Sequence, residues 1–348
     1  MTEDNAEAGR QRAPLKVDLA LQGGGSHGAF AWGALERLLE HEWMEVEGIS
    51  GTSAGAMNAA VFAYGMMTGG RDGAREAMET FWKRVSDAAR FSPFQRTPFD
   101  KLTGNWTLDN SPAYIFADTL SRFVSPFDVG GSDYNPLRQI LEETIDFEAL
   151  AKGPIKLFIT ATNVRTGRGR VFRRDEITAD VLLASACLPT MFRPIEIDGE
   201  EYWDGGFSGN PTITPLVREC DSRDTFLVQI NPVNRPDTPK TARDIVNRIN
   251  EISFNATLLK ELKMVAMMRQ VADPGNSEGK AWGEMRLHRI SSDIMIELSA
   301  SSKLNAEWAF LEMLRGEGRK AADDFAAKHR DDVGVRSSFD FETLLEGM

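Results

Sequence analysis

The sequence predicts an α/β fold in which a mostly parallel sheet carries helices on both faces. A strand-like apolar run at 15–22 meets consecutive glycines and then a helical pattern at 28–41. A second short strand at 46–51 is followed by a helix of small residues that begins near Ser53. Alternating strands and helices are typical of parallel sheets, because a helix is the usual crossover between parallel strands.

The later segments extend this plan. Residues 1–14 are polar and predict a disordered tail, whereas 69–135 lack clean periodicity, are rich in proline and aromatic residues, and predict a helical cap or lid insertion. The remaining pattern predicts a helix at 136–150, a strand hairpin over 155–174, a helix at 178–189, a strand–turn–strand at 195–206 and a buried strand at 225–231.

The sequence predicts a mostly helical C-terminal part. Residues 241–272 predict a long amphipathic helix, residues 285–292 a last strand, and 303–329 one or two helices. We expect the long helix to pack on the core or to form a dimer face, with gating or lipid contact as the alternative. Its predicted packing face consists of Ile245, Ile249, Ile252, Ala256, Leu259 and Leu262. The expected domains are therefore 15–232 and a C-terminal helical extension, 233–348, packed on it.

Composition excludes several classes of function. The net charge of −12 argues against nucleic acid, whose phosphates are bound by clustered Lys and Arg, and against docking on anionic lipid by charge alone. No run of about 18 apolar residues predicts a membrane span, and the N-terminus has no secretory pattern. The two cysteines, Cys187 and Cys220, are expected to be free thiols in a cytoplasmic protein.

The first glycine run raises the question of a dinucleotide site. Gly23, Gly25 and Gly28 match Gly-x-Gly-x-x-Gly between a strand and a helix. A dinucleotide site also needs an acidic residue at the end of the second strand. Glu45 and Glu47 precede the apolar end of that strand, so the carboxylates lie at its wrong end.

The second strand leads into a different motif. Gly51-Thr52-Ser53-Ala54-Gly55 is Gly-x-Ser-x-Gly between a strand and a helix, the setting of a nucleophile elbow. A Cβ atom at Gly51 or Gly55 would collide with the neighbouring strand or helix. The alternative is a simple Ser/Thr-rich helix cap.

The glycine run then gains a role as an oxyanion hole. A tetrahedral oxyanion needs preorganised N–H donors, and glycines at a strand–helix junction can aim consecutive amides at one point. We assign Gly24, Gly25 and Ser26 as donors, with Gly23 shaping the turn.

A serine nucleophile needs a general base. Of the four histidines, His288 and His329 could follow the serine in the order Ser, acid, His, but both lie in segments without other signs of chemistry. Asp204 lies at the end of an apolar strand before Gly205 and Gly206; alone, Asp-Gly would predict a hairpin turn. Beside the two glycine motifs we assign it as the base. No cluster of metal ligands accompanies it, so we predict neither metal nor cofactor.

Together these motifs resemble the patatin-like phospholipases. The resemblance covers 15–232 and rests on "GGGSHG" at 23–28, "GTSAG" at 51–55 and "ASACLPTMFRPIEIDGEEYWDGGFSGNP" at 184–211. It implies a three-layer α/β/α sandwich, a Ser-Asp dyad of Ser53 and Asp204 without histidine, and lipid acyl hydrolysis. The family often has arginine where this chain has His27. His27 is then a residue that orients the loop, a proton relay or a tolerated substitution.

The resulting expectation is a serine acyl-ester hydrolase that works through an acyl-enzyme. Phospholipid, lysophospholipid, neutral glyceride and polyester-like substrates all remain open, as do peripheral membrane contact and a homodimer. The competing hypothesis is a non-catalytic lipid-binding or scaffold protein on the same fold.

Overall fold

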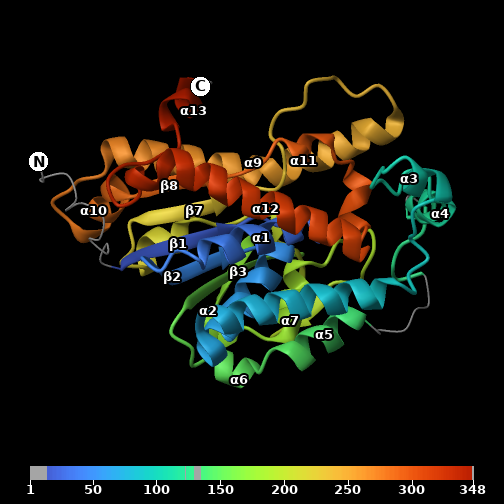
Figure 1. Ribbon diagram of the computed structural model, residues 1–348, viewed down its shortest axis with the longest axis horizontal. Helices are drawn as coiled ribbons and strands as arrows, with labels where there is room; N and C mark the ends of the chain where they lie inside the picture. Colours follow the sequence, from blue (N-terminus) through green and yellow to red (C-terminus); the bar gives the residue numbers. More distant parts are fainter. Residues whose placement is uncertain (1–13, 122, 129–134, 347–348) are drawn as a thin grey trace, which may run out of the picture.

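The computed structural model describes residues 14–121, 123–128 and 135–346 (Figure 1). Within them eight strands form one sheet in the order β5-β6-β3-β2-β1-β7-β8, and β4 also pairs with β3. The pairs that β1, β2, β3, β7 and β8 form with one another are parallel, whereas β4, β5 and β6 pair antiparallel. The strands are β1 (Leu15–Leu21), β2 (Met44–Gly51), β3 (Lys156–Asn163), β4 (Gly169–Arg173), β5 (Ile195–Ile197), β6 (Glu200–Asp204), β7 (Asp224–Val228) and β8 (Arg286–Ile290).

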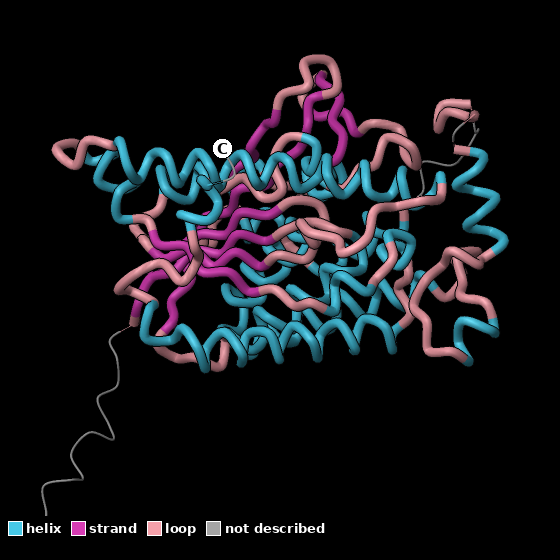
Figure 2. The backbone as a smooth tube through the Cα atoms, turned by 90° about the horizontal axis from the view of Figure 1, so that it is seen from above, coloured by secondary structure: helices cyan, strands magenta, loops and turns pink. Residues whose placement is uncertain are grey.

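Helices cover both faces of this sheet and complete three layers (Figure 2). The α-helices are α1 (Gly28–Leu38), α2 (Ala54–Ala89), α3 (Pro98–Leu102), α4 (Pro112–Leu120), α5 (Pro136–Thr144), α6 (Phe147–Leu150), α7 (Ala179–Ser185), α8 (Thr214–Glu219), α9 (Ala242–Val271), α10 (Ser277–Glu284), α11 (Ile294–Glu297), α12 (Trp308–His329) and α13 (Phe341–Glu346). The 3-10 helices are η1 (Gly25–His27), η2 (Arg174–Glu176), η3 (Gly205–Phe207), η4 (Ala300–Leu304) and η5 (Arg330–Asp332). The predicted α/β fold with a mostly parallel sheet is confirmed.

The two faces of the sheet hold two separate cores. Leu19 and Leu21 of β1 belong to the core shared with α1, α2, α7 and α12. Ala20 between them belongs to the core shared with α8, α9 and α10. Successive strand residues point to opposite faces, so a central strand buried on both sides reads as one continuous apolar run.

The helix after Ser53 is longer than the sequence pattern indicates. We expected the cap to begin at 69, but α2 continues to Ala89 and only breaks its helical geometry at Gly69 and Gly70. Its second half buries Met78 and Phe81 in the core. Two glycines interrupt the periodicity and have low helix propensity, so they imitate a helix end. The cap prediction is therefore wrong for 69–89, while α3 and α4 lie beyond it as short helices.

The packing face predicted for the long helix is wrong for most of its residues, and only Leu262 of that set is buried. α9 buries Glu251, Asn255 and Leu258, with Leu262, Val265 and Ala266, whereas Ile245, Ile249 and Ile252 are about half exposed. Arg235 satisfies Glu251, and the Gln22 amide donates to Asn255. Because tertiary partners satisfy these polar groups, the buried face does not coincide with the apolar stripe of the sequence.

The C-terminal part belongs to the same sheet as the rest. β8 pairs parallel with β7 as an edge strand, and α12 packs against α1. The sheet therefore crosses the boundary we placed at residue 232, and the separate extension stays a proposal. The predicted disordered tail lies outside the described residues except for Pro14.

Candidate functional site

Ser53 occupies a strained turn at the carboxyl edge of the sheet. It joins β2 to α2 with φ 54° and ψ −123°, a region that L-residues rarely adopt. Its amide donates to Ser185 Oγ at 2.9 Å, and that hydroxyl donates to the Thr160 carbonyl at 2.7 Å. Strain of this kind persists only when the surroundings fix it, and it concentrates at functional sites.

The glycines on either side of Ser53 allow backbones to touch. A Cβ atom at Gly51 would lie 2.5 Å from the Gly55 carbonyl oxygen. A Cβ atom at Gly55 would lie 2.2 Å from the Leu21 carbonyl oxygen at the end of β1. The close packing expected from the sequence is present, and it presses the elbow against the central strands.

Asp204 reaches Ser53 from an antiparallel strand. β6 runs inward from the carboxyl edge beside β3 and pairs Asp204 with Ala161. The carboxyl group is buried and accepts the Gly206 amide at 2.7 Å, and the Ser53 side chain is near enough to lower its pKa. Burial raises the pKa of Asp204 to about 7, against the lowering effects of Gly206, Ser53 and Lys303. A carboxylate with a raised pKa is a stronger base than an exposed one.

The two glycines after Asp204 let neighbouring elements approach. A Cβ atom at Gly205 would lie 2.0 Å from the Thr160 carbonyl oxygen of β3. A Cβ atom at Gly206 would lie 2.0 Å from the Phe254 ring of α9. The turn after Asp204 is therefore held between the sheet and the long helix.

The glycine run lies directly beside the elbow. A Cβ atom at Gly23 would lie 2.7 Å from Ser53 Cβ, and one at Gly28 would lie 2.7 Å from Ala54 Cβ. The Gly23 amide donates to Asn210 Oδ1 at 2.7 Å, so Gly23 is an anchor of the loop and not an oxyanion donor.

The next amides of the loop are free to bind a ligand. In the described part of the chain, the Gly24 and Gly25 amides form no hydrogen bond with another protein group. Ser26 lies in the middle of η1 and is buried. The two adjacent amides of Gly24 and Gly25 are therefore available for the role of oxyanion donors that the sequence predicts for them.

His27 points away from the serine into the C-terminal part of the chain. Its Nε2 lies 2.8 Å from Ser302 Oγ, and Ser302 already donates to the Ser299 carbonyl, so Nε2–H is the donor. Burial, with the charges of Lys303 and Arg235, lowers the pKa of His27 well below its usual value and keeps the ring neutral. None of its described contacts reaches Ser53 or Asp204, which favours loop orientation over proton relay.

The other histidines lie elsewhere. His288 Nε2 contacts Asp224 at 2.9 Å at the amino end of β7, and His329 pairs with Asp332 in the last turns. Among residues 14–121, 123–128 and 135–346, no three His, Cys, Asp or Glu side chains gather as a metal site would require.

Four polar residues that support the site are missing from the residues predicted from the sequence. Ser185 holds the elbow, Asn210 and Asn231 hold Gly23, and Lys303 donates to Asn231 Oδ1 at 2.7 Å. Asn210 follows the Asp-Gly-Gly motif closely enough to have been noticed. The other three are single polar residues whose partners are distant in sequence.

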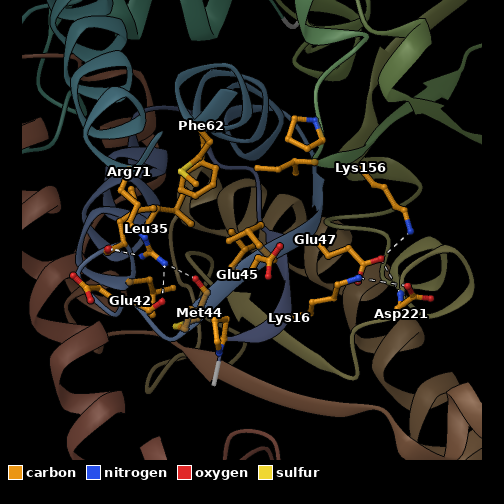
Figure 3. A pocket seen from close by; sticks show the side chains of 18 residues that line it. Lys16, Leu35, Glu42, Met44, Glu45, Glu47, Phe62, Arg71, Lys156 and Asp221 are labelled. Carbon is orange, nitrogen blue, oxygen red and sulfur yellow. Dashed lines mark hydrogen bonds and ion pairs between the residues drawn. The ribbon is translucent and has the colours of Figure 1, made fainter. Parts of the chain in front are cut away.

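A pocket of about 600 Å³ lies at the opposite edge of the sheet (Figure 3). Lys16, Met44 and Lys156, at the amino ends of β1, β2 and β3, contribute to its lining. Since Ser53 follows the carboxyl end of β2, this pocket is separate from the candidate site.

Comparison with known proteins agrees with this geometry. The family model described as patatin-like phospholipase matches residues 19–217, which is more than half of the chain. The fold search found VipD from Legionella pneumophila at 16% identity and TM-score 0.41, covering 91% of this chain and 68% of that one. It also found ExoU from Pseudomonas aeruginosa, in complex with SpcU, at 16% identity and TM-score 0.28, covering 93% of this chain and 62% of that one. The curated proteins gave no match. On the family match, the chain belongs to the patatin-like phospholipase family.

Proposed function

We propose that the protein is a serine acyl-ester hydrolase acting on lipids through a Ser53–Asp204 dyad. Membership of the family supports lipid acyl hydrolysis in general. The observation that carries the specific proposal is Ser53 in a strained elbow, near a buried Asp204 carboxyl and beside two loop amides without a protein partner. No metal or cofactor enters this chemistry.

The mechanism follows from what each group can do. Asp204 takes the proton of the Ser53 hydroxyl, whose oxygen attacks the ester carbonyl carbon. The Gly24 and Gly25 amides bind the oxyanion, and its collapse expels the alcohol, protonated by Asp204. Water then attacks the acyl-enzyme with Asp204 again as base, and the acid leaves. The positive end of α2 also favours negative charge at this point.

The direct test is active-site labelling with a fluorescent fluorophosphonate. We expect the wild type to be labelled, Ser53→Ala to be unlabelled and Asp204→Asn to be labelled far more slowly. A wild type that stays unlabelled with and without detergent micelles would favour the competing hypothesis of a lipid-binding protein without catalysis.

Gly25→Ala tests the oxyanion loop. Gly25 has φ +59°, and its Cβ atom would lie 2.4 Å from the Lys303 carbonyl oxygen, so we expect the loop to shift. Loss of one oxyanion donor typically lowers kcat by about 10²–10³-fold. Hydrolysis of a soluble p-nitrophenyl ester measures this.

Gly167→Ala is the matched control for Gly25→Ala. Gly167 has φ +67°, and no atom lies within 4 Å of its Cβ position, so the substitution adds backbone strain without a collision. Equal losses of kcat in the two variants would contradict the role of the Gly25 loop.

The surface beside the site has the chemistry of a lipid contact. We define the apolar rim as Ile245, Ile249 and Ile252 of α9 with Phe207, all about half exposed. Phe207 follows Asp204 by three residues and stacks on Phe254 of α9, with ring centroids 5.0 Å apart. Phe207 therefore brings exposed apolar surface to the catalytic turn, whereas the isoleucines lie on another side of α9, and we propose that the rim rests on a lipid surface. No helix in the described residues is long and apolar enough to cross a membrane.

The pair of substitutions Ile249→Asp and Ile252→Asp tests the rim. We expect binding to phosphatidylcholine vesicles to fall by about tenfold or more, because each isoleucine loses roughly 1–2 kcal/mol of apolar burial. Hydrolysis of a soluble ester should stay unchanged. Vesicle co-sedimentation and a p-nitrophenyl ester assay give the two readouts.

Met267→Asp with Val271→Asp is the control, since both residues are exposed on the same helix at its far end. If both double variants lost vesicle binding equally, the loss would reflect only the added negative charge. That result would contradict a role of the rim in lipid binding.

A further inference from the structure

The glycine loop rests on a segment that lies outside the family match. η4 contacts η1, and a Cβ atom at Gly25 would lie 2.4 Å from the Lys303 carbonyl oxygen. The neighbouring Ser302 accepts the hydrogen bond of His27. Backbone and side-chain contacts therefore fix Lys303 against the loop that carries the free amides.

The Lys303 ammonium orients the group that holds Gly23. It donates to Asn231 Oδ1 at 2.7 Å, and Asn231 Nδ2 donates to the Gly23 carbonyl at 2.7 Å. Because an ammonium has only donors, it fixes the amide with its oxygen toward Lys303 and its nitrogen toward Gly23. Asn210 holds the Gly23 amide from the other side.

Lys303 lies among several charged groups. Burial lowers its pKa, while the negative charges of Glu251 and Asp204 oppose that change and Arg235 adds to it. Arg235 pairs with Glu251 at 2.5 Å, so these two largely balance each other. His27 is neutral and adds no charge.

Asp204 has few other neighbours that could stabilise its charge. The Gly206 amide, the Ser53 hydroxyl and Lys303 lower its pKa, in that order, against the larger effect of burial. Cys187 also faces it, but burial and the charge of Asp204 raise the pKa of this thiol to about 12, so it stays uncharged. Lys303 is thus the cation that favours the ionised carboxylate.

We propose that Lys303 is a positioning residue of the acyl-transfer site, which holds Asn231 against the glycine loop and stabilises the ionised form of Asp204. The inference rests on the proposed function. As the proton moves from Ser53 to Asp204, negative charge passes from the carboxylate to the oxyanion. Lys303 packs against the loop through its backbone and through Asn231, and its charge also acts on the Asp204 carboxyl, so it bears on both groups between which the charge moves. In this chain, whose glycine loop carries a neutral His27, the cation beside the loop comes from the C-terminal part.

Three substitutions separate the two roles of Lys303. Lys303→Gln keeps a donor for Asn231 but removes the charge, Lys303→Met removes both, and Lys303→Arg keeps the charge. We measure kcat/KM for p-nitrophenyl butyrate from pH 5 to 9, after circular dichroism has verified folding. In the Gln and Met variants we expect the acid limb, the decline of kcat/KM at low pH, to shift to higher pH by roughly half a unit to one unit. A shift of this size is expected for charges several ångströms apart. The Arg variant should keep the wild-type limb.

In the same pH profiles, kcat/KM on the plateau above the acid limb measures how well the glycine loop is positioned. We expect kcat/KM above the acid limb to fall about tenfold in Lys303→Met and less in Lys303→Gln, because misplaced groups lose rate steeply. Lys320→Met, an exposed lysine of α12 paired with Asp324, is the control and should match the wild type.

An acid limb in Lys303→Gln and Lys303→Met that superimposes on the wild type would overturn the role of Lys303 while leaving the dyad intact. A wild type that neither hydrolyses the ester nor reacts with fluorophosphonate would overturn the proposed function and this inference together.

Discussion

Replacing Ser53 by alanine should lower kcat for ester hydrolysis by about 10⁴-fold or more, which is typical for loss of a catalytic nucleophile. The alanine removes the oxygen that forms the acyl-enzyme, and the remaining loop amides cannot replace it. KM should change little, because the side chain is small and the loop stays in place. Initial rates with a soluble p-nitrophenyl ester measure both parameters.

The control for Ser53→Ala is Ser253→Ala, at an exposed serine on α9 whose hydroxyl only donates to the Ile249 carbonyl. It should hydrolyse the ester at the wild-type rate. Substantial turnover in Ser53→Ala would contradict a covalent mechanism at this serine and point to another nucleophile.

Replacing Asp204 by asparagine should have opposite effects on rate and stability. An amide cannot accept the serine proton, so we expect kcat/KM to fall by about 10³–10⁴-fold. In the wild type kcat/KM should decline as the pH falls through about 7, where Asp204 becomes protonated. A pH–rate profile and a kinetic comparison of the two proteins test this.

The stability effect follows from the same raised pKa. The folded pKa of Asp204 is about 7 and its usual value is 3.8, so the folded state binds the extra proton between these two values. Stability of the wild type therefore falls as the pH rises from about 4 to 7. Asp204→Asn should raise the free energy of unfolding by about 2–4 kcal/mol at pH 8, and the gain should vanish near pH 4.

Urea unfolding at the two pH values measures this gain. Asp198→Asn is the matched control, because this exposed carboxylate lies in the turn before the same strand and its positive φ of 54° suits asparagine. An equal gain of stability in both variants, or a gain that persists at pH 4, would contradict a buried and destabilising Asp204.

The sequence allowed the nucleophile, base and glycine loop to be proposed because each sits in a compact motif. A turn between a strand and a helix requires glycines at fixed offsets, so Ser53 and Asp204 are marked by their immediate neighbours. Ser185 and Lys303 carry no such mark. Their roles arise from contacts with Ser53 and Asn231 that lie 132 and 72 positions away.

The errors in the fold also arise from contacts that the local sequence pattern does not show. The packing face predicted for α9 assumes that its apolar residues face the core. The core side instead holds Glu251 and Asn255, whose partners lie elsewhere in the chain. The apolar stripe of Ile245, Ile249 and Ile252 is exposed. At Gly69 and Gly70 a break in periodicity resembles the end of a helix, although the helix continues to Ala89. In both cases tertiary contacts override a local preference.

The contact between Gly206 and Phe254 limits which parts of the chain could be exchanged with those of a relative. α9 occupies the space that a side chain at Gly206 would need, and η4 does the same at Gly25. A chimera that joined residues 1–232 to the C-terminal part of a relative would have to recover both contacts at once. The catalytic motifs and the C-terminal third are therefore expected to be inherited as one unit, and exchange of the third as a free-standing module should yield inactive hybrids.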